Sequence, residues 1–133
     1  MPWKILITAR GAQAAGEQAQ ELLRNAGCEI IFPPKFGPLM GDDLTAALDG
    51  MDAVLASLDG YSAAALSSPA ASRLKIIARW GVGYDSVDVA AATRNGIVVT
   101  YTPGLLDDAV ADYTFTLLLA LARRVHEVHV TMQ

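Results

Sequence analysis

The chain has 133 residues, enough for one domain, and 53% of them are hydrophobic, which suffices for a substantial core. Its formal net charge of −4, with Lys and Arg scattered along the chain, argues against nucleic acid or an acidic membrane as a partner. No segment reaches the ~20 apolar residues of a membrane span, no signal peptide is visible and the lone Cys28 cannot form an internal disulfide, so we expect a cytoplasmic protein in which Cys28 is a buried, reduced thiol.

Short apolar runs alternate with segments of helical periodicity through most of the chain. The apolar runs predict five buried strands, over residues 3–9, 28–32, 52–57, 74–79 and 97–101. The segments between them predict helices over residues 13–26, 42–48, 61–66 and 89–94. Glycines follow three of these helices, and Ser86 or Asp88 can cap the last one.

This alternation predicts an α/β fold. Strands that are apolar on both faces and joined by crossover helices form a parallel sheet with helices on both faces. We expect a flavodoxin-like, five-stranded sheet with the strand order 2-1-3-4-5. In such sheets the functional loops lie at the carboxyl ends of the strands.

Residues 107–130 predict one long helix, whose apolar side chains recur at spacings of three and four. At 1.5 Å per residue this helix would span roughly 35 Å, and it is apolar most of the way round. Such a helix needs an extensive partner surface, so we expect either a homodimer through it or a further domain that covers it. No Gly or Pro ends it before Gln133, and we therefore expect a truncated protein: a domain over residues 1–104, and a helix over 105–133 that leads to a domain absent from the sequence.

The segment Gly81-Val82-Gly83 directly follows the fourth predicted strand. A dinucleotide fingerprint, Gly-x-Gly-x-x-Gly, would need a third glycine where Ser86 stands, and an acidic residue about 20 positions onward, where Tyr101 stands. Two alternatives remain open from the residues alone. The glycines could form a tight turn before a helix, or a nest of backbone N–H groups that binds an anion such as a carboxylate.

Four motifs suggest which alternative applies. They are the segments Leu-Lys-Ile-Ile-Ala-Arg-Trp-Gly-Val-Gly-Tyr-Asp-Ser-Val-Asp (74–88), Ala-Ala-Ala-Thr-Arg-Asn-Gly-Ile-Val-Val-Thr (90–100), Thr-Pro-Gly (102–104) and Asp-Ala-Val-Ala-Asp-Tyr-Thr-Phe-Thr-Leu-Leu-Leu-Ala-Leu-Ala-Arg-Arg (108–124). In order and spacing they resemble the D-isomer-specific 2-hydroxyacid dehydrogenases, especially the D-3-phosphoglycerate dehydrogenase branch. Residues 1–73 resemble the family more loosely, in their strand–helix rhythm and in the segment 58–62.

The resemblance implies that most of the chain is the substrate-binding, or catalytic, domain of an NAD-dependent oxidoreductase. Such an enzyme transfers a hydride between NAD(H) and a D-2-hydroxy acid or 2-keto acid, with 3-phosphoglycerate as one candidate. The loop that matches Gly81, Val82 and Gly83 would bind the substrate carboxylate, with Arg79 beside it as a further candidate for substrate binding. Val82 and Val110 would contact the cofactor.

The chain departs from the family pattern at three points. Tyr101 stands where an Asn commonly precedes Thr-Pro-Gly, and Asp112 stands where Glu is usual. The catalytic Arg, Glu and His of the family match no position here, because they would lie beyond Gln133 together with the NAD fingerprint. We therefore expect the full-length protein to be the enzyme and this chain alone to be inactive.

Other patterns predict less. His126 and His129 lie three positions apart on the long helix, but no third ligand accompanies them, so we predict no metal site. Tyr61 and Ser62 follow the third strand and either line the cleft or begin a helix. Two rival functions stay open: a non-catalytic, corepressor-like interaction module with a dehydrogenase fold, and a phospho-receiver, for which the acidic pair expected after the first strand is missing at Thr8.

Overall fold

The computed structural model describes residues 1–132, and these divide into two units, Met1–Thr102 and a second that begins at Pro103. The first unit contains a single five-stranded parallel sheet with the order β2-β1-β3-β4-β5. This confirms the predicted α/β fold and strand order. The strands are shorter than predicted but lie within the predicted ranges: β1 (Lys4–Ile7), β2 (Glu29–Ile31), β3 (Ala53–Ala56), β4 (Ile76–Arg79) and β5 (Val98–Thr100).

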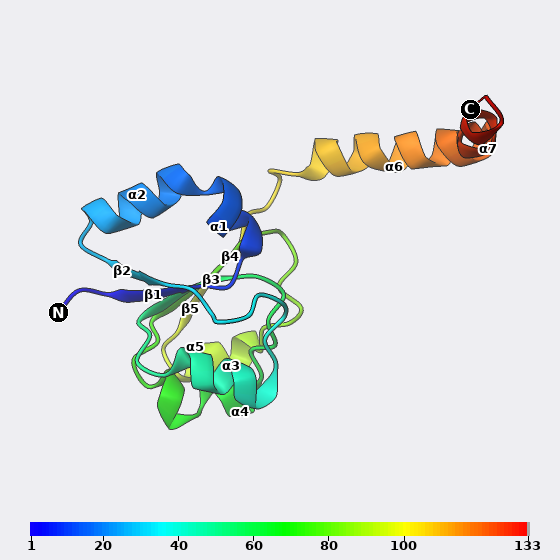
Figure 1. Ribbon diagram of the computed structural model, residues 1–133. Helices are drawn as coiled ribbons and strands as arrows, with labels where there is room; N and C mark the ends of the chain where they lie inside the picture. Colours follow the sequence, from blue (N-terminus) through cyan, green and yellow to red (C-terminus); the bar gives the residue numbers. More distant parts are fainter. Residues whose placement is uncertain (133) are drawn as a thin grey trace. The chain divides into compact units, whose positions relative to one another are not determined.

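Helices cover both faces of this sheet (Figure 1). One face carries α1 (Arg10–Ala15) and α2 (Glu17–Asn25), and the other carries α3 (Gly41–Leu48), α4 (Ala63–Leu66) and α5 (Val89–Arg94), with a 3-10 turn at Pro69–Ala71. The second face holds the larger core, in which side chains from the strands pack against Leu44, Leu48 and Leu66. Each of these leucines is almost fully buried, so its truncation to alanine would cost about 2–5 kcal/mol.

The single helix predicted over residues 13–26 is wrong, because the structure contains two helices that meet at Gly16. The buried side chain of Gln20 stabilises the junction: its Nε2 donates to the carbonyl oxygens of Ala12, at 2.9 Å, and Gln13, at 3.3 Å. These carbonyls lie in the last turn of α1, where the Ala12 carbonyl also accepts from the Gly16 N–H at 3.1 Å. A Cβ at Gly16 would clash with the Ala12 carbonyl oxygen, so the junction requires glycine.

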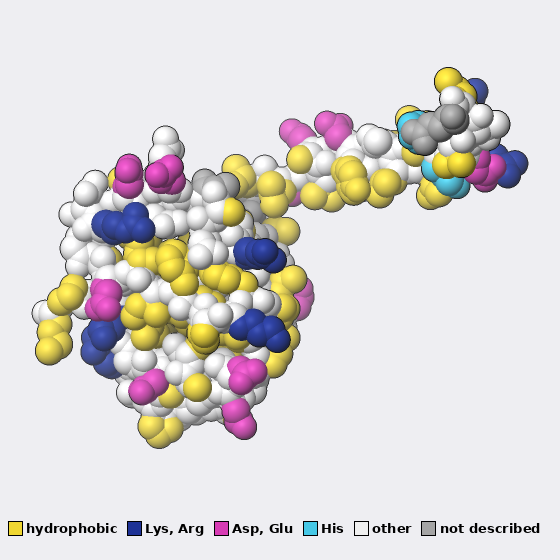
Figure 2. Space-filling view, in the orientation of Figure 1, with side chains coloured by type: hydrophobic (Ala, Val, Ile, Leu, Met, Phe, Trp, Pro, Cys, Tyr) yellow, Lys and Arg dark blue, Asp and Glu magenta, His cyan; other side chains and the backbone are white. Residues whose placement is uncertain are grey.

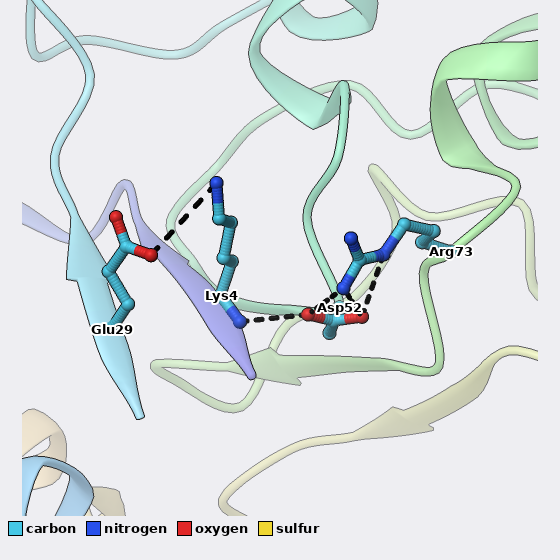
Figure 3. Close-up of polar contacts among 4 residues, drawn as sticks. All are labelled: Lys4, Glu29, Asp52 and Arg73. Carbon is cyan, nitrogen blue, oxygen red and sulfur yellow. Dashed lines mark hydrogen bonds and ion pairs between the residues drawn. The ribbon is translucent and has the colours of Figure 1, made fainter. Parts of the chain in front are cut away.

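A polar cluster joins the amino ends of the strands (Figure 3). The Lys4 N–H donates to Asp52 Oδ2 at 2.8 Å, and Arg73 donates to the same carboxylate through Nε and Nη2. The Lys4 side chain also lies 3.9 Å from Glu29. The pKa of Asp52 is lowered from its ordinary value of 3.8, first by the Lys4 N–H and then by Arg73. The cluster therefore ties β1 to β3 and to the segment that leads into β4.

Helices α1 and α2 cover only part of their face of the sheet. Ile5, Ala53, Ile76 and Val98 are paired neighbours in one row across four strands. Ile5 and Ala53 are buried beneath the helices, Ile76 is half-buried, and Val98 on the edge strand is 57% exposed. Apolar residues of α2, β3 and β4 line a hollow of about 520 Å³ on this side.

The second unit contains α6 (Asp107–Ala122) and α7 (Val125–Thr131). One continuous helix over residues 107–130 was predicted, and this is wrong, because Arg124 adopts a left-handed conformation with φ of 52° that interrupts the helix. Its guanidinium forms an ion pair with Glu127 in the next turn, and no Gly or Pro marks the break in the sequence. Among the described residues, no helix is both long and apolar enough to cross a membrane.

Candidate functional site

The glycine loop, residues 81–85, lies at the carboxyl edge of the sheet, and only Trp80 separates it from β4. Backbone hydrogen bonds fix both of its ends. The Trp80 N–H donates to the carbonyl of Ala56 at 2.9 Å, and the Thr102 N–H donates to the carbonyl of Gly81 at 3.0 Å. At the other end, the Val87 N–H donates to the carbonyl of Tyr84 at 2.9 Å. The centre of the loop is thus suspended between two anchored ends.

Gly81 and Gly83 contribute differently to this loop. Gly81 has a φ of +141°, a conformation that L side chains rarely adopt, and a Cβ there would lie 3.2 Å from Arg79 Nη1. At Gly83 an added Cβ would meet only Asp85 Oδ2, at the ordinary contact distance of 3.6 Å. The fold therefore requires glycine at position 81 but not at position 83.

The centre of the loop offers unused hydrogen-bond donors. Within residues 1–132, the backbone N–H groups of Val82 and Gly83 donate to no protein acceptor. Both residues are exposed, Val82 to 49%. Adjacent backbone N–H groups that point to solvent can bind an anion without any charged side chain. This geometry fits the second of the two alternatives that the sequence left open, a nest of backbone N–H groups that binds an anion.

Arg79, the last residue of β4, is buried, with only 8% of its surface exposed. Its Nη1 donates to the carbonyl oxygens of Ala56, at 3.3 Å, and Trp80, and its Nε has no partner in the described chain. No carboxylate of residues 1–132 lies within ion-pair distance of the Arg79 guanidinium. The alternative of a solvated strand end is therefore wrong. A buried, unpaired cation is costly, and an anion bound nearby would offset that cost.

A buried polar network lies beside Arg79. Asp59 is fully buried and accepts hydrogen bonds from the hydroxyls of Thr8 and Tyr61. Burial, and next the charge of Asp59, raise the pKa of Tyr61 well above its usual range, while the charge of Arg79 acts in the opposite direction. The interpretation of Tyr61 as a cleft-lining residue is wrong, because its side chain is fully buried.

Sequence reasoning noted the segment 58–62 but gave Asp59 no role. The available signal was an acidic residue shortly after β3, a strand whose apolar side chains indicate burial. Ser62, the other residue expected at the cleft or at a helix start, begins α4: its hydroxyl accepts a hydrogen bond from the Ala65 N–H at 3.3 Å.

Exposed side chains surround the glycine loop. The rings of Tyr84 and Tyr101 are in contact, with centroids 5.1 Å apart, so Tyr101 packs beside the loop. Asp85 is exposed and adds a negative charge at the same place.

The structure therefore brings four of the predicted site residues together in the first unit, namely Arg79, Gly81, Val82 and Gly83. Val110 belongs to the second unit, on α6, where it is 60% exposed. In the described chain no three His, Cys, Asp or Glu side chains are grouped so that they could hold a metal ion.

Comparison with known proteins gives a consistent picture. Residues 5–132 match the family described as "D-isomer specific 2-hydroxyacid dehydrogenase, catalytic domain". Glyoxylate reductase of Thermococcus litoralis is 60% identical over 57 residues, which are 43% of this chain and 17% of the relative.

Among solved structures, the TT0316 protein of Thermus thermophilus is 36% identical with a TM-score of 0.78, over 93% of this chain and 38% of that one. The NAD+-bound 3-phosphoglycerate dehydrogenase of Entamoeba histolytica is 27% identical with a TM-score of 0.77, over 90% of this chain and 39% of that one. The chain thus spans well under half the length of the proteins that it matches.

Proposed function

Because the chain belongs to the D-isomer specific 2-hydroxyacid dehydrogenase family, we propose that its first unit is the substrate-binding part of an NAD-dependent oxidoreductase. The longer enzyme would transfer a hydride between NAD(H) and a D-2-hydroxy acid or its 2-keto acid. The observation that supports this function is the glycine loop, in which two free backbone N–H groups lie next to a buried and unpaired arginine.

In this proposal the Val82 and Gly83 N–H groups donate to the two oxygens of the substrate carboxylate. A carboxylate is an acceptor at both oxygens, which matches two neighbouring donors. Gly83 lacks a side chain, so the carboxylate can approach the backbone closely. Gly81 shapes the loop by its left-handed conformation and leaves space for the Arg79 guanidinium beneath it.

Arg79 would contribute its charge without leaving the interior. Its Nη1 is held by the carbonyls of Ala56 and Trp80, so the guanidinium is fixed under the loop. In a partly desolvated site a fixed positive charge stabilises an anion more strongly than it does in water. Arg79 thus raises the affinity of the loop for any 2-hydroxy or 2-keto acid, while its position in the interior gives it little part in choosing among them.

Only the similar proteins narrow the choice of substrate within this class. A relative that is 60% identical over the matched segment is a glyoxylate reductase, and a structural neighbour is a 3-phosphoglycerate dehydrogenase. Glyoxylate is a 2-keto acid and 3-phosphoglycerate is a 2-hydroxy acid. We therefore propose a small acid of this class as the substrate, with glyoxylate and 3-phosphoglycerate as the first candidates.

NAD is proposed as the cofactor, since the similar 3-phosphoglycerate dehydrogenase structure holds NAD+. When bound, NAD accepts or donates the hydride. Val82 and Val110, which are both exposed, would supply apolar contacts to it. The family's catalytic Arg, Glu and His match no position in residues 1–133. We therefore propose that this chain binds substrate weakly and does not reduce glyoxylate with NADH.

The second unit is proposed to form a homodimer through α6. Leu117, Leu118 and Leu121 are all exposed on this helix, and Figure 2 shows hydrophobic side chains along it with acidic ones at its start. Apolar side chains on several sides of one helix stabilise a protein only when another surface covers them. A second copy would supply an equivalent apolar helix.

A titration followed by NMR would test the carboxylate site. The ¹⁵N-labelled chain is titrated with sodium oxamate, an unreactive analogue of 2-keto acids, and in parallel with sodium chloride at the same ionic strength. We expect oxamate, and not chloride, to shift the N–H signals of Val82 and Gly83.

The matched variant is Gly83→Ala, whose added Cβ meets no close neighbour and so leaves the fold intact. It should weaken oxamate binding by about tenfold. Equal shifts with both salts, or an unchanged affinity in the variant, would contradict the proposal. Turnover by the longer protein would exclude the non-catalytic, corepressor-like alternative.

A further inference from the structure

Asp59 is a charged group without a charged partner. Its side chain is fully buried, and in residues 1–132 no Lys or Arg lies within ion-pair distance of it. Both oxygens are nonetheless satisfied. Oδ1 accepts from the Leu39 N–H at 2.9 Å, and Oδ2 accepts from the Thr8 hydroxyl, from the Ser57 N–H at 3.2 Å and from the Tyr61 hydroxyl at 3.3 Å. A buried carboxylate is unfavourable unless such donors compensate it, so the fold holds these donors around Asp59.

These donors come from different parts of the carboxyl edge. Thr8 follows β1, Leu39 lies in the segment between β2 and α3, and Ser57 and Tyr61 follow β3. A further backbone hydrogen bond, from the Gly60 N–H to the Leu39 carbonyl at 2.9 Å, reinforces the link between two of these segments. One carboxylate therefore joins the loops that follow three neighbouring strands.

Tyr61 extends this connection to the glycine loop. Its N–H donates to the carbonyl of Ser86, and its carbonyl accepts from the Asp88 N–H, both at 2.9 Å. These bonds form a short parallel bridge between Tyr61 and Val87. Residues 86–88 immediately follow the glycine loop, so the position of Tyr61 determines where the far end of the loop is held. The near end is held by Thr102 through Gly81.

We propose that Asp59 is a positioning residue for the anion site: through Tyr61 it holds the glycine loop in the conformation that presents the Val82 and Gly83 N–H groups to a carboxylate. This inference rests on the proposed function of the loop. Asp59 itself does not touch the ligand. Its effect is to keep the free donors ordered before the ligand arrives, which lowers the entropic cost of binding.

The contacts explain why a carboxylate is needed at position 59. An asparagine has one acceptor atom and one NH₂ donor. If its oxygen accepted from the Leu39 N–H, its NH₂ group would face the Ser57 N–H, which would keep only its bond to Thr8 Oγ1, at 3.0 Å. If the amide were reversed, the NH₂ group would oppose the Leu39 N–H. The carboxylate accepts from the Leu39 and Ser57 N–H groups through two different oxygens, which the amide cannot do.

A comparison of two buried aspartates of the same sheet tests this inference. Asp59→Asn removes the carboxylate that joins the loops at the carboxyl edge. Asp52→Asn, the matched control, removes the hydrogen-bonded carboxylate at the amino edge. Each ¹⁵N-labelled variant of this chain is titrated with sodium oxamate, and its unfolding is measured in urea. We expect both variants to lose stability. Asp59→Asn should bind oxamate about tenfold more weakly, whereas Asp52→Asn should retain the parent affinity within about twofold.

The outcomes separate the two proposals. If the parent chain binds oxamate at the glycine loop and Asp59→Asn binds equally well, the positioning role is overturned while the proposed function stands. If the parent chain does not bind oxamate at the loop, both are overturned. If Asp59→Asn lacks a dispersed spectrum, Thr8→Val decides, because it keeps the carboxylate and removes only the Thr8 hydroxyl, which donates to Asp59 and accepts from the Ser57 N–H at 3.0 Å. It should weaken binding by about threefold, and an unchanged affinity would overturn the inference.

Discussion

Replacing Gly81 by alanine is expected to destabilise the first unit, whereas the same replacement at Gly83 is not. At position 81 the backbone has a φ of +141°, which an L residue adopts only with strain of about 1–3 kcal/mol. The added Cβ would also lie 3.2 Å from Arg79 Nη1, tighter than ordinary contact. Arg79 is buried and held by two carbonyls, so it cannot move aside freely.

These terms together suggest a loss of about 2 kcal/mol for Gly81→Ala, which corresponds to a fall in Tm of about 10 °C for a domain of this size. Gly83→Ala meets only Asp85 Oδ2 at 3.6 Å. Because alanine restricts the unfolded chain more than glycine does, this variant should be within about 1 kcal/mol of the parent, on either side.

Thermal unfolding followed by circular dichroism, with urea unfolding as a second measure, distinguishes the two variants. A Gly81→Ala variant as stable as the parent would refute the claim that position 81 requires glycine. A large loss of stability in Gly83→Ala would show that this glycine also serves the fold. The weaker oxamate binding of that variant would then no longer show that the added Cβ blocks the ligand. The two alanine variants are thus each other's control.

Three further predictions concern charge and assembly. Because the pKa of Asp52 is lowered from 3.8, its carboxylate contributes stability that is present above that value and lost as the pH falls through the lower folded-state pKa. The free energies of unfolding of the parent and Asp52→Asn, measured in urea, should therefore differ by about 1–3 kcal/mol at neutral pH and converge below 3.8, and a constant difference would contradict this. Asp85→Asn should tighten oxamate binding by about threefold at low salt, because two like unit charges about 6 Å apart in water repel by about 0.7 kcal/mol. The gain should vanish at high salt, and a weaker affinity would show that Asp85 helps to form the loop. Leu118→Glu on α6 should convert a dimer into a monomer in sedimentation analysis, and an unchanged mass would refute dimerisation through this face.

Local patterns in the sequence were sufficient for the architecture of the first unit. Apolar runs such as residues 52–57 and 74–79 predicted the strands, since a strand buried on both faces needs apolar side chains at almost every position. The loop after β4 was also identified, because two glycines next to a buried strand indicate unusual backbone or close approach of a ligand. The alternation of strands and helices indicated a parallel sheet with crossover helices, and the flavodoxin-like strand order expected for it is confirmed.

Other features depended on contacts between distant residues. Thr8 and Asp59 are separated by 51 positions and Leu39 and Asp59 by 20, and no periodicity links such pairs. The burial of Arg79 was likewise hidden, because an arginine at a strand end is equally compatible with solvent. The helix breaks at Gly16 and Arg124 arise from a side-chain contact with backbone carbonyls and from one left-handed residue, which helical periodicity does not encode.

The sequence alone therefore determined the parallel sheet, its connections and the position of the glycine loop, because each is recorded in the spacing of neighbouring side chains. The tertiary structure decided which polar groups are buried, which backbone donors remain free and which carboxylate holds the loops together. Those properties depend on the energy of removing a charged or polar group from water, and this energy is set by neighbours that only the folded chain brings into contact.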